Sequence, residues 1–243
     1  MNRCIALLVV CAGAPPADAW AAQATPSRVT VVALAPVEVP RDLAQHGLAV
    51  TRLTALIATT LRDSGYAVVP PETTLAVWVR TRDALGGFYD TYTGKVIPTK
   101  RDSIISATRL ALRDGFGADV WVRPSIRIVA ARFEGGRARW DGIDDATGGT
   151  GGPLAFLLQG TVWSALLTPT SGTIAGASLH VAVDDMDGRR LYERAGGIRL
   201  LAHLVQGEWQ AVTNPFGDPS RNATAVRLAL DSLPVVVAPR RGR

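Results

Sequence analysis

Two short segments of this chain carry residue types that bind ligands or partners. In the first, Tyr89, Asp90 and Tyr92 lie among turn-forming residues, and loop aromatics often anchor interfaces. The alternative is a loop folded back on its own tyrosines. In the second, Trp140 precedes Asp141, so its ring could cover a sugar face. The two carboxylates of glycosidic chemistry could then be drawn from Asp90, Asp141 and Asp184. A simpler alternative is a tryptophan packed on a sheet and an acid in a turn. We treat all five residues as binding candidates and assign no catalytic residue.

No complete catalytic or cofactor motif accompanies these candidates. Ser178 and His180 would point to one face of a strand about 7 Å apart, too far for a hydrogen bond without a bulge, and the serine lacks a Gly-x-Ser-x-Gly elbow. The Gly94-Lys95 pair lacks the earlier glycine and the following hydroxyl residue of a phosphate loop. The segment before Gly188 resembles part of a calcium loop, with Asp184, Asp185 and Asp187 as possible ligands. The bidentate acid at the far end of such a loop is missing. We expect neither a metal nor a cofactor.

The first 22 residues have the pattern of a secretory signal peptide. Arg3 provides a positive start, residues 5–13 are apolar, and small-x-small cleavage sites end at Ala19 and Ala21. Such a leader predicts a periplasmic or secreted protein. We expect a signal peptide over residues 1–22.

The two cysteines of the chain both lie in this leader. Cys11 resembles the lipidated cysteine of a lipoprotein signal, but Val10 before it is larger than the Gly, Ala or Ser that the lipidation box prefers. A lipid anchor on Cys11 is therefore disfavoured. Removal of Cys4 and Cys11 with the leader would leave no thiol for catalysis, metal binding or redox chemistry.

The composition is typical of a folded chain. Hydrophobic residues make up 47% and charged residues 19%, with a formal net charge of +5. All basic residues except Lys95 and Lys100 are arginines, and they are scattered through the sequence, so we do not expect nucleic-acid binding. The apolar stretch 154–167 is interrupted by Gln159-Gly160 and fits a hairpin or buried helix better than a membrane span.

Hydrophobic periodicity predicts helices mixed with strands. Strands are expected at residues 28–39, 66–69, 118–133, 137–143, 176–184 and 189–196, and helices at 48–62, 72–85, 100–114 and 220–233. Asp102 is the expected N-cap of the third helix, and residues 144–153 form a glycine-rich loop. The pattern predicts an α/β (α+β) fold, a mixed and mainly antiparallel sheet flanked by helices. Residues 23–239 would form a single domain, followed by a basic tail at 240–243.

This order of elements resembles a group of bacterial envelope domains. The segments VTVVALAPVEV, VTRLTALIATTLRDSGYAVV, GFGADVWVRPSIRIV and SLHVAVDDMDGRRLY are similar to CsgG-like curli-secretion proteins, the TolB N-terminal domain and LpoB-type activators of peptidoglycan synthases. The resemblance implies an α/β domain of the periplasm or outer envelope that acts by binding other proteins. It implies no catalytic residues.

We therefore expect an exported, non-enzymatic protein that contributes to cell-envelope assembly or secretion through contacts with envelope proteins, and that could form a homo-oligomer. The alternative is a secreted hydrolase or a carbohydrate- or small-ligand-binding protein that uses Asp90, Tyr92, Trp140 and Asp141 in one cleft. A further alternative is a ligand-binding module with residues 148–152 as its lid.

Overall fold

The computed structural model describes residues 31–147, 171–205 and 208–233. Within these ranges the strands are β1 (Val31–Leu34), β2 (Ala67–Val69), β3 (Val120–Glu134), β4 (Arg137–Trp140), β5 (Ile143–Ala146), β6 (Ser171–Asp185), β7 (Arg190–Leu200), β8 (Ala202–Val205) and β9 (Glu208–Ala211). The helices are η2 (Arg41–His46), α1 (Gly47–Asp63), α2 (Pro71–Ala84), α3 (Pro98–Phe116) and α6 (Pro219–Leu230). Strands β1 to β7 form one mixed, mostly antiparallel sheet, and β8 pairs with β9. The expected fold class is confirmed.

The chain opens with the predicted strand, helix and strand. Strands β1 and β2 are parallel neighbours, and α1 connects them across one face of the sheet. Val50, Leu53, Ile57 and Leu61 follow the three- and four-residue spacing of a helical stripe, and all four are buried in the main core. Helix α1 ends before Gly65, which has φ 86° and so adopts the left-handed conformation that glycine tolerates.

Three long strands form the centre of the sheet. Strands β3 and β6 pair antiparallel from Val120–Asp185 to Glu134–Ser171, and β7 pairs along the other side of β6. Because side chains alternate along a strand, Val120 and its alternate neighbours enter the core under α1 and α6. The residues between them point to the opposite side of the sheet, where Trp121 packs in a second buried cluster with Val77 of α2 and Leu112 of α3. Beyond Trp121 this side carries Arg123, Ser125 and Arg127, and we call it the polar face.

The expected loop at residues 144–153 is corrected at its start. Residues 143–146 form strand β5, which pairs with β4 after the turn Asp141-Gly142. Strand β5 is fixed by Asp145, which is buried and accepts two hydrogen bonds, of 2.7 and 3.0 Å, from Arg221 at the start of α6. Local periodicity could not show this, because Arg221 is distant in sequence. The rest of the expected loop lies outside the described residues.

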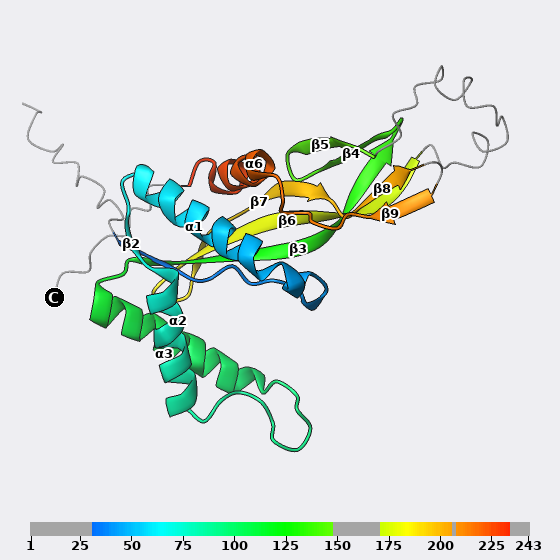
Figure 1. Ribbon diagram of the computed structural model, residues 1–243. Helices are drawn as coiled ribbons and strands as arrows, with labels where there is room; N and C mark the ends of the chain where they lie inside the picture. Colours follow the sequence, from blue (N-terminus) through cyan, green and yellow to red (C-terminus); the bar gives the residue numbers. More distant parts are fainter. Residues whose placement is uncertain (1–30, 148–170, 206–207, 234–243) are drawn as a thin grey trace, which may run out of the picture.

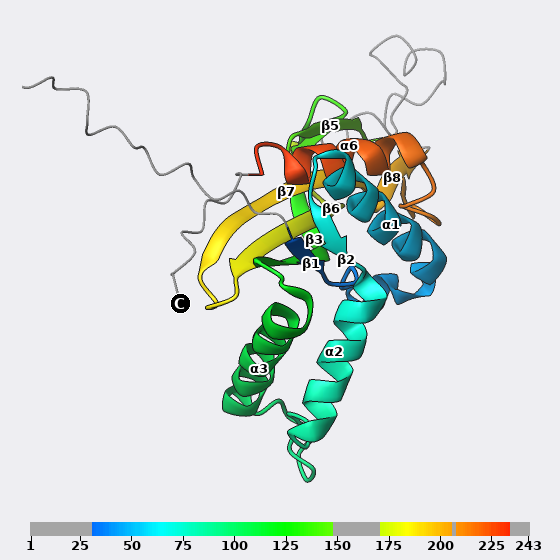
Figure 2. The same cartoon turned by 90° about the vertical axis from the view of Figure 1, so that its left-hand side faces the viewer.

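Helices α2 and α3 form an antiparallel hairpin that extends from the sheet (Figure 2). The expected N-cap Asp102 is wrong, because α3 begins earlier, at Pro98, with Ile97 as its N-cap. Proline is favoured in the first helical turn since its missing N–H is not needed there. Gly117, with φ 65°, ends the helix.

Helix α6 covers the centre of the sheet on the same side as α1 (Figure 1). Asp218 caps its N-terminus by accepting hydrogen bonds from the backbone of Ser220 and Arg221. None of the helices in the described ranges has the length and apolar character needed to cross a bilayer. The predicted leader, the apolar stretch 154–167 and the tail lie outside those ranges.

Candidate functional site

The structure places the five candidate binding residues in two separate groups. Tyr89, Asp90 and Tyr92 lie in the connection between α2 and α3, whereas Trp140 ends β4 and Asp141 lies in the turn before β5. This connection and the β4–β5 hairpin are far apart in both views of the molecule (Figures 1 and 2). Asp90 and Asp141 therefore do not form a shared two-carboxylate site.

Trp140 packs inside the sheet and does not present its ring to a ligand. Its side chain is buried against Gly176 and Gly197, at positions where a Cβ atom would lie within 3.0 Å of the indole. Its Nε1 donates a hydrogen bond of 3.3 Å to the carbonyl of Ala177. Trp140 thus closes the core between β4, β6 and β7, as the simpler interpretation of the sequence predicts.

Asp141 accepts a hydrogen bond from a buried serine. The Oγ of Ser178 lies 2.5 Å from Asp141 Oδ2, and Nε2 of His180 lies 3.9 Å from the same oxygen. A serine hydrolase requires the imidazole to take the serine proton, but here the carboxylate occupies that position and Ser178 is fully buried. The three residues therefore lack the geometry of a nucleophilic triad. The hydrogen bond between Ser178 and Asp141 holds the β4–β5 turn against β6.

The environment of His180 favours its neutral form. Burial and the nearby charge of Arg127 lower the pKa of His180, although the carboxylates of Asp141 and Glu193 act in the opposite direction. Its Nε2 is buried without a hydrogen-bond partner.

The connection between α2 and α3 is an ordered turn built around Asp90. Its Oδ1 accepts hydrogen bonds from the backbone N–H groups of Tyr92 and Thr93 and from the Thr93 hydroxyl. These bonds lower the pKa of Asp90, so the carboxylate stays ionised. Asp90 is thus used inside the turn, and it holds Tyr92 at the surface with 96% of its area exposed.

Large exposed hydrophobic side chains gather on this helical hairpin. Of the eleven in the described ranges, seven lie on α2, on α3 or between them. They are Leu75, Leu85, Tyr89, Tyr92, Val96, Leu110 and Phe116. Isolated exposed apolar residues are ordinary, but a concentration on one projecting element marks an interaction surface. We call residues 85–101, which hold four of the seven, the tip.

Aromatic rings connect the tip to the sheet. Phe88 lies 4.6 Å from Tyr89 and 6.2 Å from Trp78, and Trp78 lies 6.5 Å from Trp121 of β3, measured between ring centroids. Such separations are those of favourable offset and tilted aromatic pairs. The tip is therefore supported by a continuous row of side chains.

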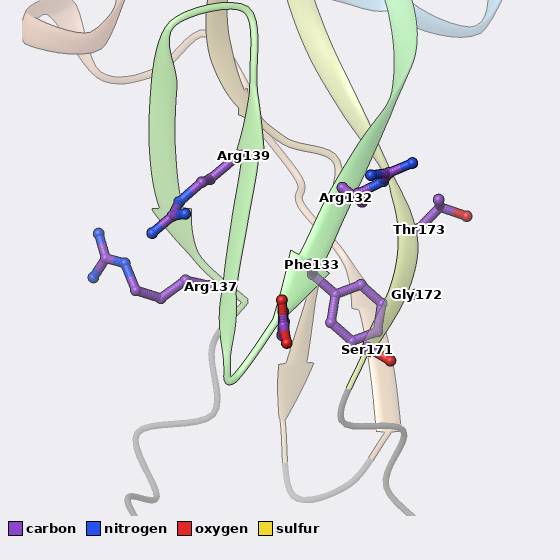
Figure 3. Close-up of a pocket in the computed structure, with 8 residues that line it drawn as sticks. Arg132, Phe133, Arg137, Arg139, Ser171, Gly172 and Thr173 are labelled. Atoms are coloured by element: carbon purple, nitrogen blue, oxygen red, sulfur yellow. The ribbon is translucent and has the colours of Figure 1, made fainter.

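A cavity of about 680 Å³ lies at the far end of β3, β4 and β6. Its lining includes Arg132, Arg137 and Arg139, which suggests an anion site. Figure 3 shows, however, that Arg137 and Arg139 point towards one side of the cavity and Arg132 towards the other. Arg137 and Arg139 are paired with Asp144 of β5. Three guanidinium groups line this cavity without converging in it.

Arginines do converge on the polar face, in a cluster that the sequence analysis did not identify. Asp184 of β6 is 2% exposed and accepts hydrogen bonds from Arg190 Nε at 2.6 Å, Arg123 Nη2 at 2.5 Å and Arg109 Nη2 at 3.3 Å. Burial alone would raise the pKa of Asp184, but the hydrogen bond from Arg190 and the charge of Arg123 lower it below its usual value. We call Asp184 and these three arginines the arginine cluster.

One pattern in the sequence pointed to part of this cluster: the alternation of side chains along a strand places Trp121 and Arg123 on the same face of β3. The other partners come from α3 and β7 and could not be assigned from spacing. Asp184 also has no role in a calcium loop, since its carboxylate is occupied by the arginines. Within the described ranges, no three His, Cys, Asp or Glu side chains lie close enough to hold a metal.

Comparisons of this chain with protein families, with curated proteins and with solved structures find no match.

Proposed function

We propose that this chain is an exported, non-enzymatic protein of the bacterial cell envelope that binds a protein partner through the tip of its α2–α3 hairpin. The observation that carries the proposal is the concentration of exposed hydrophobic side chains on one projecting element. The leader-like residues 1–22 and the resemblance to envelope domains support the location. The proposed activity is the positioning of a partner during envelope assembly or secretion.

The tip has the properties of a pre-formed binding surface. Tyr92 is almost fully exposed, and tyrosine is enriched among residues that dominate interface energies. The hydrogen bond from the Tyr92 backbone N–H to Asp90 fixes the backbone that presents this side chain, and the row of aromatic rings supports the tip, so less backbone entropy is lost on binding.

The charge around the tip defines the chemistry of the partner. Lys95, Lys100 and Arg101 are exposed there, whereas the one acid within the tip, Asp90, is used in the turn. Both lysines of the chain therefore lie at this surface. Of the two acids that border the tip, Asp83 is paired with Arg82 and Asp102 is exposed. The tip fits a partner with an apolar contact area bordered by acidic side chains, because opposite charges speed encounter and fix orientation.

Affinity capture of the full-length protein after crosslinking in intact cells tests the proposal. A tagged wild-type chain should recover an exported protein with an acidic surface, and both Tyr92→Ser and Lys95→Glu should reduce its yield. Leu48→Ser provides the matched control, because Leu48 is an 83% exposed apolar residue on α1, outside the tip. Equal recovery by the tip variants and the wild type would contradict the proposal.

A further inference from the structure

The arginine cluster holds more positive charge than its acids neutralise. Three guanidinium groups share the single carboxylate of Asp184. A further acid, Glu193, accepts a hydrogen bond of 2.5 Å from Arg190 and also lies 3.5 Å from Arg127. Four arginines therefore face two carboxylates, and arginine remains charged at any physiological pH. An excess of two positive charges is left on this part of the polar face.

Three arginines are more than a buried aspartate needs for its own neutralisation. One bidentate arginine can satisfy a carboxylate. Here the Nε atoms of Arg109 and Arg123 are buried without a hydrogen-bond partner, so these guanidinium groups are partly desolvated and incompletely paired. Like charges held together in such a setting repel one another, and an anion would relieve the repulsion.

The surroundings hold the cluster in a fixed arrangement. Arg109 and Arg123 lie 5.8 and 5.5 Å from the ring of Trp121, within cation–π distance. Gly188, in the turn between β6 and β7, leaves space for Arg109, because a Cβ atom there would lie 2.6 Å from Arg109 Nη1. The arginines are therefore positioned before any ligand binds.

Arg123 and Arg190 are the members of the cluster that a ligand can reach. Their side chains are 32% and 40% exposed, whereas that of Arg109 is 12% exposed. They bind different oxygens of the same carboxylate, so their guanidinium groups are neighbours. Arg123 uses Nη2 for Asp184 and has an Nη1 group left to donate.

We infer that Arg123 and Arg190, positioned by Asp184, form a binding site for a phosphate group. A phosphate monoester carries close to two negative charges at neutral pH and offers three acceptor oxygens, which match the excess charge and the two neighbouring guanidinium groups. The phosphate is either free or part of a larger molecule. The site is independent of the tip, since it lies on the sheet and uses other residues.

Titration of the full-length protein with inorganic phosphate and with glycerol 3-phosphate tests this inference. Isothermal titration calorimetry at constant ionic strength should show saturable binding of at least one probe. Arg123→Gln and Arg190→Gln should each weaken that binding by about tenfold or more, the loss expected for one charge-assisted hydrogen bond. Binding of glycerol 3-phosphate alone would assign the site to a phosphate ester, and binding of inorganic phosphate alone would assign it to the free ion.

Two controls keep the test specific. Arg62→Gln removes an exposed arginine of α1, outside both the cluster and the tip, and should leave the affinity unchanged. Arg190→Lys retains the charge, should fold if Arg190→Gln does not, and should still weaken binding because lysine lacks the planar set of donors. The inference is overturned if neither probe binds, or if Arg62→Gln weakens binding as much as the cluster variants do.

Discussion

Gly196 of β7 lies against the backbone carbonyl of Ala225 in α6. A Cβ atom at position 196 would be 2.1 Å from that oxygen, and helix backbone cannot move aside as a flexible side chain can. The absence of a side chain at Gly196 therefore allows α6 to approach the sheet closely and bury Ala225 and Val226. This contact sets how the C-terminal helix covers the main core.

Gly196→Ala should lower the free energy of unfolding by about 1–3 kcal/mol or more, because the added methyl group forces α6 away from β7. Urea denaturation measures this loss. Gly115→Ala is the matched control, since a Cβ at this position in α3 meets no atom within 4 Å and the substitution should be neutral or stabilise by up to about 1 kcal/mol. Equal stability of the two variants would contradict the described contact.

Tyr192→Phe should destabilise the protein by about 1 kcal/mol, since the Tyr192 hydroxyl lies 2.9 Å from the carbonyl oxygens of both Ala229 and Asp231 at the end of α6. Loss of the hydroxyl leaves the Ala229 carbonyl without this donor. Chemical denaturation measures this loss. The control variant Tyr92→Phe should be as stable as the wild type, because Tyr92 is exposed. A denaturation midpoint of Tyr192→Phe equal to that of the wild type would contradict a stabilising role for these hydrogen bonds.

Asp184→Asn should lower stability at pH 7 by about 3–5 kcal/mol, as expected when one partner of a buried charge network is removed. The effect depends on pH. Because the pKa of Asp184 is lower in the folded protein than in the unfolded chain, its stabilising contribution is present above the unfolded value and is lost as the pH falls through the folded value. The difference in unfolding free energy between the variant and the wild type should therefore be smaller at pH near 3 than at pH 7.

His180→Gln should reduce the loss of stability on mild acidification. Burial and Arg127 lower the pKa of His180 below its unfolded value near 6.5, so stability is full above that value and decreases as the pH falls towards the folded pKa. The groups that face the imidazole are Arg127, Asp141 and Glu193. Thermal unfolding at pH 7.5 and 5.0 measures the effect. An identical change in Tm for both proteins would show that His180 does not contribute.

Much of the fold was predictable because it depends on local periodicity. The stripe from Val50 to Leu61 indicates α1, and the alternation after Val120 indicates β3 with one apolar and one polar face. The turn Asp185–Gly188 followed from its Asp-Gly pair, and Gly188 does adopt φ 95°. In each case the residues that determine the element lie within a few positions of one another.

The features that escaped prediction depend on partners distant in sequence. Strand β5 is held by the pair of Asp145 and Arg221, and the arginine cluster draws on α3, β3 and β7 around Asp184. The use of Asp141 by Ser178 likewise depends on how the β4–β5 turn folds over β6. Composition shows that such residues exist, but only the tertiary arrangement determines which of them meet.

The proposed role of the tip is tested most directly by site-specific photocrosslinking in intact cells. A photoreactive amino acid is placed at Tyr92 in one variant and at Leu48 in another, two highly exposed apolar positions on different elements. If the tip binds a partner, position 92 should give one defined crosslinked product, less of it when Lys95→Glu is added, and position 48 should give none. The absence of a crosslink at position 92, or the same products from both positions, would contradict it.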